Sequence, residues 1–142
     1  MDTKTVERLI ETASECRKNA YCPYSKYSVG AAVLTKNGNI FSGCNIENAG
    51  LSATVCAERN AIFKAVSEGE RKFQAVAIVS GTQGKKPKDY PSPCGICRQV
   101  MAEFCNPDKF IVILAKNEKD FLVYTLSELL PLSFWPDKLK SN

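Results

Sequence analysis

Three cysteines and one carboxylate carry the strongest chemical signal in this chain. Cys56 and Glu58 are two residues apart, and Cys94 and Cys97 follow far downstream with two residues between them. Zinc takes four ligands, and catalytic zinc sites commonly use three protein ligands and leave one position for water or substrate. Three thiolates and a neighbouring carboxylate therefore suit a hydrolase that activates water beside a metal ion.

The spacing alone does not settle this interpretation. A lone C-x-x-C pair is also typical of redox dithiols and of half-sites in structural zinc ribbons. A structural zinc site would need a fourth ligand, but Cys56 has no second cysteine close to it, and the chain contains no histidine. The pattern C-A-E followed by a distant P-C-x-x-C is much more specific than either part.

Two helices are expected to position these side chains. Apolar residues at helical spacing predict a helix over 57–66, and Pro93 is expected to open a second helix. Cys56 and Cys94 would then lie at helix N-termini, where free N–H groups and the macrodipole favour negative charge. Three thiolates on one zinc leave a net charge of −1, which Arg59 is expected to offset as an outer-shell donor. Arg98 is expected on a solvated helix face.

At several separate motifs the chain resembles the small, homotetrameric cytidine deaminase family, whose members include zinc sites made of three cysteines with a glutamate that is not a ligand. The likeness covers nearly the whole chain. The matching segments are residues 22–25 (CPYS), 29–32 (VGAA), 43–49 (GCNIENA), 56–59 (CAER), 92–99 (SPCGICRQ) and 128–131 (ELLP).

The resemblance implies a mechanism. Cys56, Cys94 and Cys97 would bind one zinc ion per subunit, with water as the fourth ligand. Glu58 would take the proton of that water, deliver it to N3 of cytosine and assist the departure of ammonia from C4. The backbone of Ala57 would hold the edge of the base. Taken alone, an acidic residue such as Glu58 is simply favourable at a helix N-terminus.

Substrate choice is expected to rest on Asn45 and Glu47. In the family, the matching residues hydrogen-bond the ribose, chiefly its 3′-hydroxyl, which an amide and a carboxylate can do together. A carboxylate there would repel a 3′-phosphate, which favours free nucleosides, both cytidine and deoxycytidine, over polynucleotides. The alternative is a polar loop after a strand, with the asparagines as turn formers.

Three positions concern the walls of this expected site. Tyr27 stands where the family generally has phenylalanine beside the nucleoside, and its hydroxyl needs a partner. Leu51 departs from the tyrosine of many relatives. Phe134 matches an aromatic residue that covers the nucleoside in an adjacent subunit, which implies a homotetramer with shared sites. Ordinary packing of a strand and of the tail is the alternative for Tyr27 and Phe134.

Composition favours one compact cytoplasmic domain over residues 1–142. Hydrophobic residues make up 44% of the 142 residues, and 19 basic and 15 acidic residues give a net charge of +4. Lys85, Lys86 and Lys88 form no concentrated basic stripe, so neither a nucleic-acid nor a membrane partner is expected. An odd number of cysteines, seven, favours a reducing compartment.

Strands alternating with helices predict a three-layer α/β/α sandwich with a five-stranded mixed sheet, as in cytidine deaminases. Asn37-Gly38 is a strong hairpin signal between the first two strands. The expected helices are an opening helix ending near residues 19–20, then 57–66, a helix from Pro93, and a short one over 125–130. The expected strands are 27–35, 40–44, 74–80, 110–115 and 121–124.

Three functional hypotheses follow. The first is hydrolytic deamination of cytidine and deoxycytidine to the uridine products, a step of pyrimidine salvage. The second is a related deaminase acting on polynucleotide cytosine or on a cytosine-bearing antibiotic, against which Asn45 and Glu47 weigh. The third is a non-catalytic zinc module, which would have a fourth protein ligand and no use for Glu58.

Overall fold

The computed structural model describes residues 1–139. One five-stranded mixed sheet runs through the molecule, with strand order β2-β1-β3-β4-β5. The elements in chain order are α1 (Thr3–Arg17), β1 (Tyr27–Thr35), β2 (Ile40–Cys44), the 3-10 turn η1 (Leu51–Ala53), α2 (Ala57–Ser67), β3 (Phe73–Thr82), α3 (Gly95–Glu103), β4 (Ile111–Asn117), β5 (Asp120–Thr125), α4 (Leu126–Leu129) and α5 (Pro136–Leu139).

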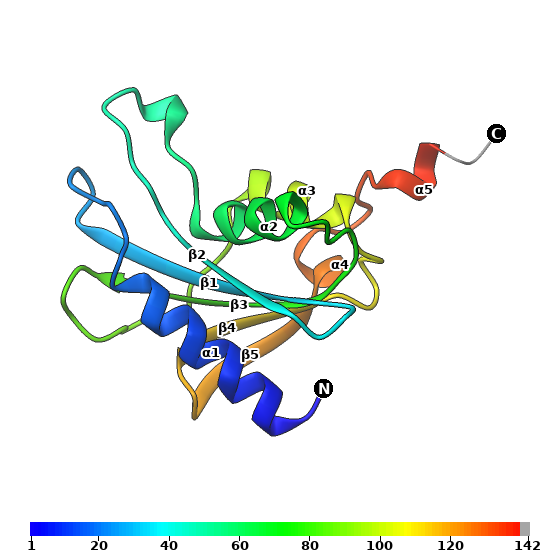
Figure 1. The fold of residues 1–142 in the computed structure, drawn as a ribbon, viewed down its shortest axis with the longest axis horizontal. Helices are drawn as coiled ribbons and strands as arrows, with labels where there is room; N and C mark the ends of the chain where they lie inside the picture. Colours follow the sequence, from blue (N-terminus) through cyan, green and yellow to red (C-terminus); the bar gives the residue numbers. More distant parts are fainter. Residues whose placement is uncertain (140–142) are drawn as a thin grey trace.

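Helices cover both faces of the sheet (Figure 1). α1 packs on one face through Leu9, Ile10 and Ala13, which join one buried cluster with residues of the sheet. α2 and α3 pack on the opposite face, where Ala61 and Met101 belong to a second, larger cluster. The expected three-layer α/β/α arrangement with a five-stranded mixed sheet is therefore confirmed.

The strand pairings explain where the two site helices lie. β1 pairs antiparallel with both β2 and β3, while β3 pairs parallel with β4. Parallel neighbours cannot be joined by a tight turn, so the chain must cross over a face of the sheet between them. α3 lies in this crossover, and the loop that leads into it carries Cys94.

Two glycines let helices lie directly on the sheet. A Cβ atom at Gly30 would lie 1.9 Å from the carbonyl oxygen of Ala13 in α1. A Cβ atom at Gly43 would lie 2.4 Å from the amide nitrogen of Ala61 in α2. Real Cβ atoms do not approach backbone so closely, and glycine at these positions allows α1 and α2 to contact opposite faces of the sheet.

Most predicted elements are confirmed, and the first two strands have the predicted limits. The helix expected to open at Pro93 begins instead at Gly95, because Cys94 has extended backbone (φ −68°, ψ 164°) and caps the helix with its own sulfur. The short elements η1 and α5 were not expected. Within residues 1–139 no helix is long and apolar enough to cross a membrane.

Candidate metal centre and catalytic cavity

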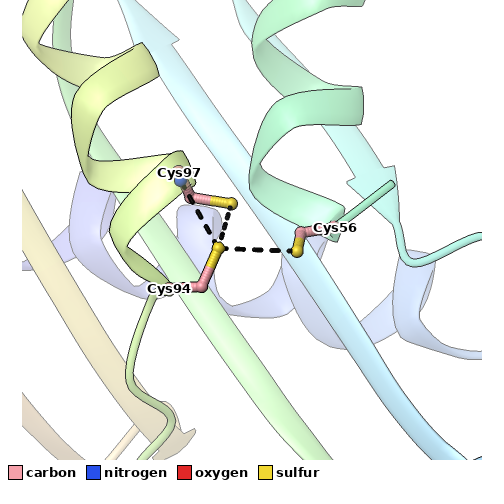
Figure 2. A group of neighbouring side chains, drawn as sticks. All are labelled: Cys56, Cys94 and Cys97. Carbon is pink, nitrogen blue, oxygen red and sulfur yellow. Dashed lines mark hydrogen bonds between the residues drawn. The ribbon is translucent and has the colours of Figure 1, made fainter. Parts of the chain in front are cut away.

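The three predicted thiols meet at the N-terminal ends of two helices (Figure 2). Cys56 is the N-cap of α2 and Cys94 is the N-cap of α3, while Cys97 lies in the first turn of α3. Their sulfur atoms all lie within 4.8 Å of one another. The Cys56 and Cys94 sulfurs are 3.8 Å apart, and those of Cys94 and Cys97 are 3.4 Å apart.

These separations fit a zinc ion. Zn–S bonds of about 2.3 Å in a tetrahedron place the sulfur atoms about 3.8 Å apart. All three cysteines are free thiols, and no fourth His, Cys, Asp or Glu joins the group within residues 1–139. The donor set is thus positioned for a metal that prefers thiolates, with one coordination position left for a small molecule.

Hydrogen bonds within the cluster distribute charge unevenly among the thiols. The hydrogen bond from Cys97, with those from Arg59 and Cys94, lowers the pKa of Cys56 to about 5 although burial acts against it. The pKa of Cys97 is raised, first by its hydrogen bond to Cys56 and then by burial. Arg59 donates from Nη2 to the Cys56 sulfur over 3.4 Å.

Glu58 lies beside the thiols and away from solvent. Its side chain is only 4% exposed, and it lines the same cavity as Cys56 and Cys94. Burial raises the pKa of Glu58 to about 7, and the charge of Cys56 acts in the same direction. A carboxyl group with a pKa near neutrality can both accept and donate a proton, which is what general acid–base chemistry requires.

A cavity of about 270 Å³ opens over the thiols. It brings together four of the predicted site residues outside the metal cluster: Tyr27, Asn45, Ala57 and Glu58. Asn45 is 8% exposed, and its side-chain amide binds the backbone at the start of β1. Its Nδ2 donates to the Tyr27 carbonyl over 2.9 Å, and its Oδ1 accepts from the Val29 amide over 2.9 Å.

Glu47 and Phe134 do not line this cavity. The Glu47 carboxylate accepts hydrogen bonds from the backbone of Tyr24 and Ser25 and from the Ser25 hydroxyl. The hydrogen bond from Ser25 is the main reason why the pKa of Glu47 is lowered. Phe134 is 61% exposed, and its carbonyl accepts a hydrogen bond from Gln99 over 2.7 Å.

Ser80 is a cavity residue that the sequence interpretation missed. Its hydroxyl lies 2.7 Å from the Tyr27 hydroxyl, which supplies the partner that Tyr27 needs, and Ser80 is almost fully buried. The available signal was a polar residue after the apolar run of β3. Thr54 and Ser92 also line the cavity, and no pattern in the sequence distinguishes them from ordinary loop residues.

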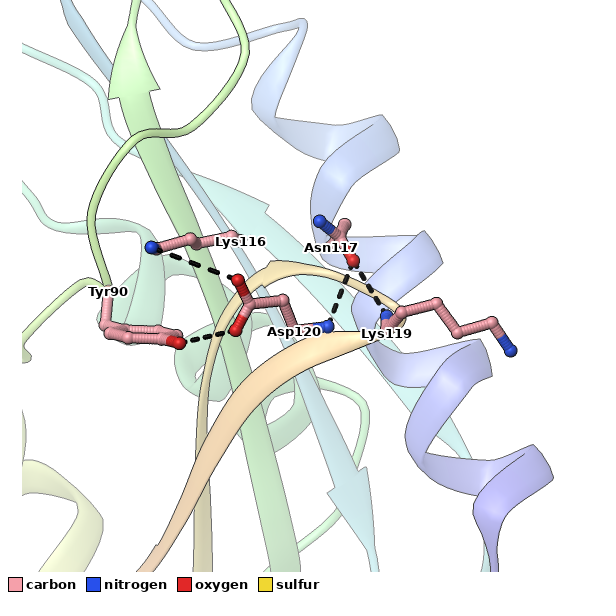
Figure 3. A network of polar contacts seen from close by, with 5 residues as sticks. All are labelled: Tyr90, Lys116, Asn117, Lys119 and Asp120. Atoms are coloured by element: carbon pink, nitrogen blue, oxygen red, sulfur yellow. Dashed lines mark hydrogen bonds and ion pairs between the residues drawn. The ribbon is translucent and has the colours of Figure 1, made fainter.

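Tyr90 forms another unexpected wall of the cavity. Its hydroxyl donates to Asp120, and the Lys116 ammonium lies 4.4 Å from the centre of its ring (Figure 3). Lys116 also pairs with Asp120 over 3.9 Å. Asn117 fixes the turn between β4 and β5 by accepting from the Asp120 amide over 3.0 Å. The loop before α3 is thus held against the β4–β5 hairpin.

The expectation for Arg98 was wrong. Its guanidinium does not lie on a solvated face but donates to the carbonyls of Pro93 and Leu129 and to the Ser92 hydroxyl. These three contacts join the loop before α3 to the end of α4. Arginine offers five donors in a rigid fork, so one side chain can serve carbonyls from separate segments.

The fold and the three-thiol cluster define a zinc-dependent deaminase. The family model described as the cytidine and deoxycytidylate deaminase zinc-binding region matches residues 3–114. The chain is 49% identical over 134 residues to a cytidine deaminase of Sporosarcina psychrophila, with 94% of each chain covered. It is 48% identical over 128 residues to a cytidine deaminase of Halalkalibacterium halodurans, with 90% of this chain and 92% of the relative covered.

Solved structures agree with these relationships. The crystal structure of a cytidine deaminase from Burkholderia pseudomallei superposes with a TM-score of 0.78 at 44% identity, covering 89% of this chain and 97% of the other. The chain belongs to the cytidine deaminase family.

Proposed function

We propose that this protein catalyses the hydrolytic deamination of cytidine and 2′-deoxycytidine, giving uridine and 2′-deoxyuridine with release of ammonia. The observation that carries the proposal is the position of Glu58, a buried carboxyl group that shares one cavity with Cys56 and Cys94. The reaction consumes one water and one nucleoside, and it requires a base for the water and an acid for the leaving amine.

Cys56, Cys94 and Cys97 are the residues that would hold zinc, and their sulfur separations support this role. Zinc, when bound, would supply the Lewis acid that brings the pKa of water toward neutrality. Arg59 offsets the negative charge of three thiolates, since its guanidinium already donates to the Cys56 sulfur. A less negative donor set leaves the metal a stronger electrophile.

Glu58 would carry the protons of the reaction. As a carboxylate it takes a proton from the attacking water and passes it to N3 of the base. Once the water oxygen has added to C4, the same group takes the remaining proton from the C4 hydroxyl and delivers it to the exocyclic amine. The C4–N bond then breaks and ammonia leaves. One residue can serve both steps because it lies beside the thiols in a site with little solvent to compete for the proton.

The nucleoside would bind in the cavity of about 270 Å³. Asn45 uses one N–H and one lone pair on the backbone and keeps one of each for a sugar hydroxyl. Glu47, two residues further, would accept from the 3′-hydroxyl and disfavour a phosphate there. The Tyr27 ring would pack against the nucleoside, and the Ala57 backbone would hold the edge of the base.

We further propose a homotetramer in which each site is completed by neighbouring subunits. Phe134 is exposed and outside the cavity of its own chain, which suits an aromatic residue that covers a nucleoside in another subunit. Tyr24, Ile46 and Leu51 are large, exposed hydrophobic residues near the loop after β2 and would pack between subunits. Each subunit would be one domain over residues 1–142.

The free state of all seven cysteines supports a location in the cytoplasm. The proposed reaction would be a step of pyrimidine salvage. The experiment is an absorbance assay of cytidine with zinc-loaded protein, in the presence and absence of a chelator, together with zinc analysis. We expect one zinc per chain and uridine formation that stops when zinc is removed. Full activity in metal-free protein, or four protein ligands on the metal, would refute the proposal.

A competition assay distinguishes nucleoside deamination from the second functional hypothesis, deamination of polynucleotide cytosine. Cytidine deamination is measured in the presence of a cytosine-containing oligonucleotide, which is also tested as a substrate. We expect turnover of the free nucleoside and none of the oligonucleotide, because on this proposal the Glu47 carboxylate would accept from the 3′-hydroxyl and would repel a phosphate attached there. Preferred turnover of the oligonucleotide would instead identify a polynucleotide deaminase.

A further inference from the structure

A second cavity lies at the other end of the two metal-site helices. Its volume is about 430 Å³, compared with about 270 Å³ for the cavity over the thiols, and the two share no lining residue. Arg71 and Lys72 line it a few residues after α2 ends, and Glu103, the last residue of α3, lines it too. Pockets that bind small organic molecules commonly span about 300–1,000 Å³.

The wall of this second cavity carries an excess of positive charge. Among residues 1–139, four basic side chains line it, those of Lys36, Arg71, Lys72 and Lys109. Two acidic residues, Glu103 and Asp137, also line it, so the basic residues exceed the acidic ones by two. A positively charged concave surface concentrates anions and binds phosphate groups.

Most of this charge has no partner among residues 1–139. Arg71 is engaged, since its Nη1 donates to the carbonyls of Val66 and Glu70 after α2. The ammonium groups of Lys36, Lys72 and Lys109 form no ion pair or hydrogen bond with any of residues 1–139. They come from three separate segments, so capping of one helix does not explain why they gather here.

An aromatic side chain completes the cavity. Trp135 is half-buried and packs against the main core cluster, and its indole contributes to the lining. Nucleobases stack on such rings with little dependence on base identity. The volume exceeds what a lone phosphate ion needs, and it would accept a phosphate joined to a sugar and a flat ring.

We propose that this cavity is a binding site for a nucleotide, separate from the deamination cavity. The phosphate lies among Lys36, Lys72 and Lys109, and the base lies against Trp135. Lysine ammonium groups bind phosphate as point charges and do not require a fixed orientation of the oxygens. The site requires no turnover, so its occupation can be measured whether or not the protein deaminates cytidine.

Trp135 is the only tryptophan of the chain, so its fluorescence reports on this cavity directly. Zinc-loaded protein is titrated with uridine 5′-monophosphate, uridine or inorganic phosphate, and calorimetry on the same samples detects binding that leaves the fluorescence unchanged. We expect saturable binding of the nucleotide, with at least tenfold lower affinity for uridine and for phosphate. No saturable nucleotide binding by either method, or equal affinity for phosphate alone, would overturn the proposal.

Two further arms locate the site. The double variant Lys72→Ala/Lys109→Ala should lower nucleotide affinity at least tenfold, whereas Lys18→Ala/Lys119→Ala, which removes two exposed lysines elsewhere, should not change it. Uridine added beforehand, at a concentration well below its dissociation constant for the second cavity, should leave the nucleotide titration unchanged. Unaltered affinity in the Lys72→Ala/Lys109→Ala variant, or displacement of the nucleotide by uridine, would place binding in the other cavity and overturn the proposal.

Discussion

The guanidinium of Arg59 lies 3.4 Å from the sulfur of Cys56, one turn back along α2. The Nε atom of the same guanidinium is buried without a hydrogen-bond partner among residues 1–139. A buried donor without a partner costs free energy of folding. The contact of Nη2 with the Cys56 sulfur offsets part of this cost. This contact places the Arg59 guanidinium directly beside the three-thiol cluster.

We predict that Arg59→Ala keeps the fold but weakens zinc retention by about 10- to 100-fold, the usual effect of losing an outer-shell partner. The measurement is zinc content after competition with a chelator, alongside turnover of zinc-saturated protein. Arg71→Ala is the matched control, because Arg71 follows α2 closely and its guanidinium donates to the carbonyls of Val66 and Glu70. Wild-type zinc retention and turnover in the Arg59 variant would show that the contact is incidental.

Replacing Glu58 by glutamine should separate binding from chemistry. Glu58→Gln preserves size and hydrogen-bonding capacity but cannot exchange a proton, so we expect turnover to fall by about 100- to 10,000-fold. Zinc content and cytidine affinity should be retained. The matched control is Glu68→Gln, at the C-cap of α2. Substantial deamination by Glu58→Gln would remove this residue from the mechanism.

The hydroxyl pair of Tyr27 and Ser80 should matter for stability more than for catalysis. Tyr27→Phe leaves the Ser80 hydroxyl buried without its partner, which should cost about 1–2 kcal/mol in the free energy of unfolding. Turnover should persist because the ring remains. Urea denaturation of Tyr27→Phe, Ser80→Ala and the double variant tests this. The free energy of unfolding lost by the double variant should be smaller than the sum of the losses in the two single variants. Additive losses would contradict it.

Packing at Gly43 should be essential for the metal centre. In Gly43→Ala the added methyl group would press on the backbone of Ala61 and Ala57, displacing the helix that Cys56 caps. We expect a loss of about 3 kcal/mol in stability, typical of overpacking, together with reduced zinc content. Gly95→Ala is the control, because nothing lies within 4 Å of its added Cβ although it neighbours Cys94. Equal losses of stability and of zinc content in the two variants would disprove the packing argument.

Local patterns in the sequence predicted most of the fold. Alternating and helical apolar spacing reports which face of an element is buried, and the Asn37-Gly38 hairpin was marked by a glycine that adopts φ +88°. The start of α3 was misplaced because sequence alone did not reveal that Cys94 would itself cap the helix. The small elements η1 and α5 have too few residues to show a period.

The metal cluster was predictable because cysteine is a rare residue type and the C-A-E and P-C-x-x-C patterns are specific together. The cavity walls were not predictable. Ser80 and Tyr90 are common residue types, and they reach the site only through the register of β3 and the contact of a loop with Asp120. Arg98 was misjudged for the same reason, since its partner at Leu129 is far away in sequence. Such long-range contacts leave no periodic mark on a single chain.

The crossover between β3 and β4 has a bearing on the order of events during folding. Cys56 and Cys94 are 38 positions apart, and they meet only after the strand between them has joined the sheet. Of the three site thiols, only those of Cys94 and Cys97 are close together in an unfolded chain, and two thiols form a weaker chelate than three. Tight zinc capture therefore comes late, and a chain that retains its ion has already completed its tertiary structure.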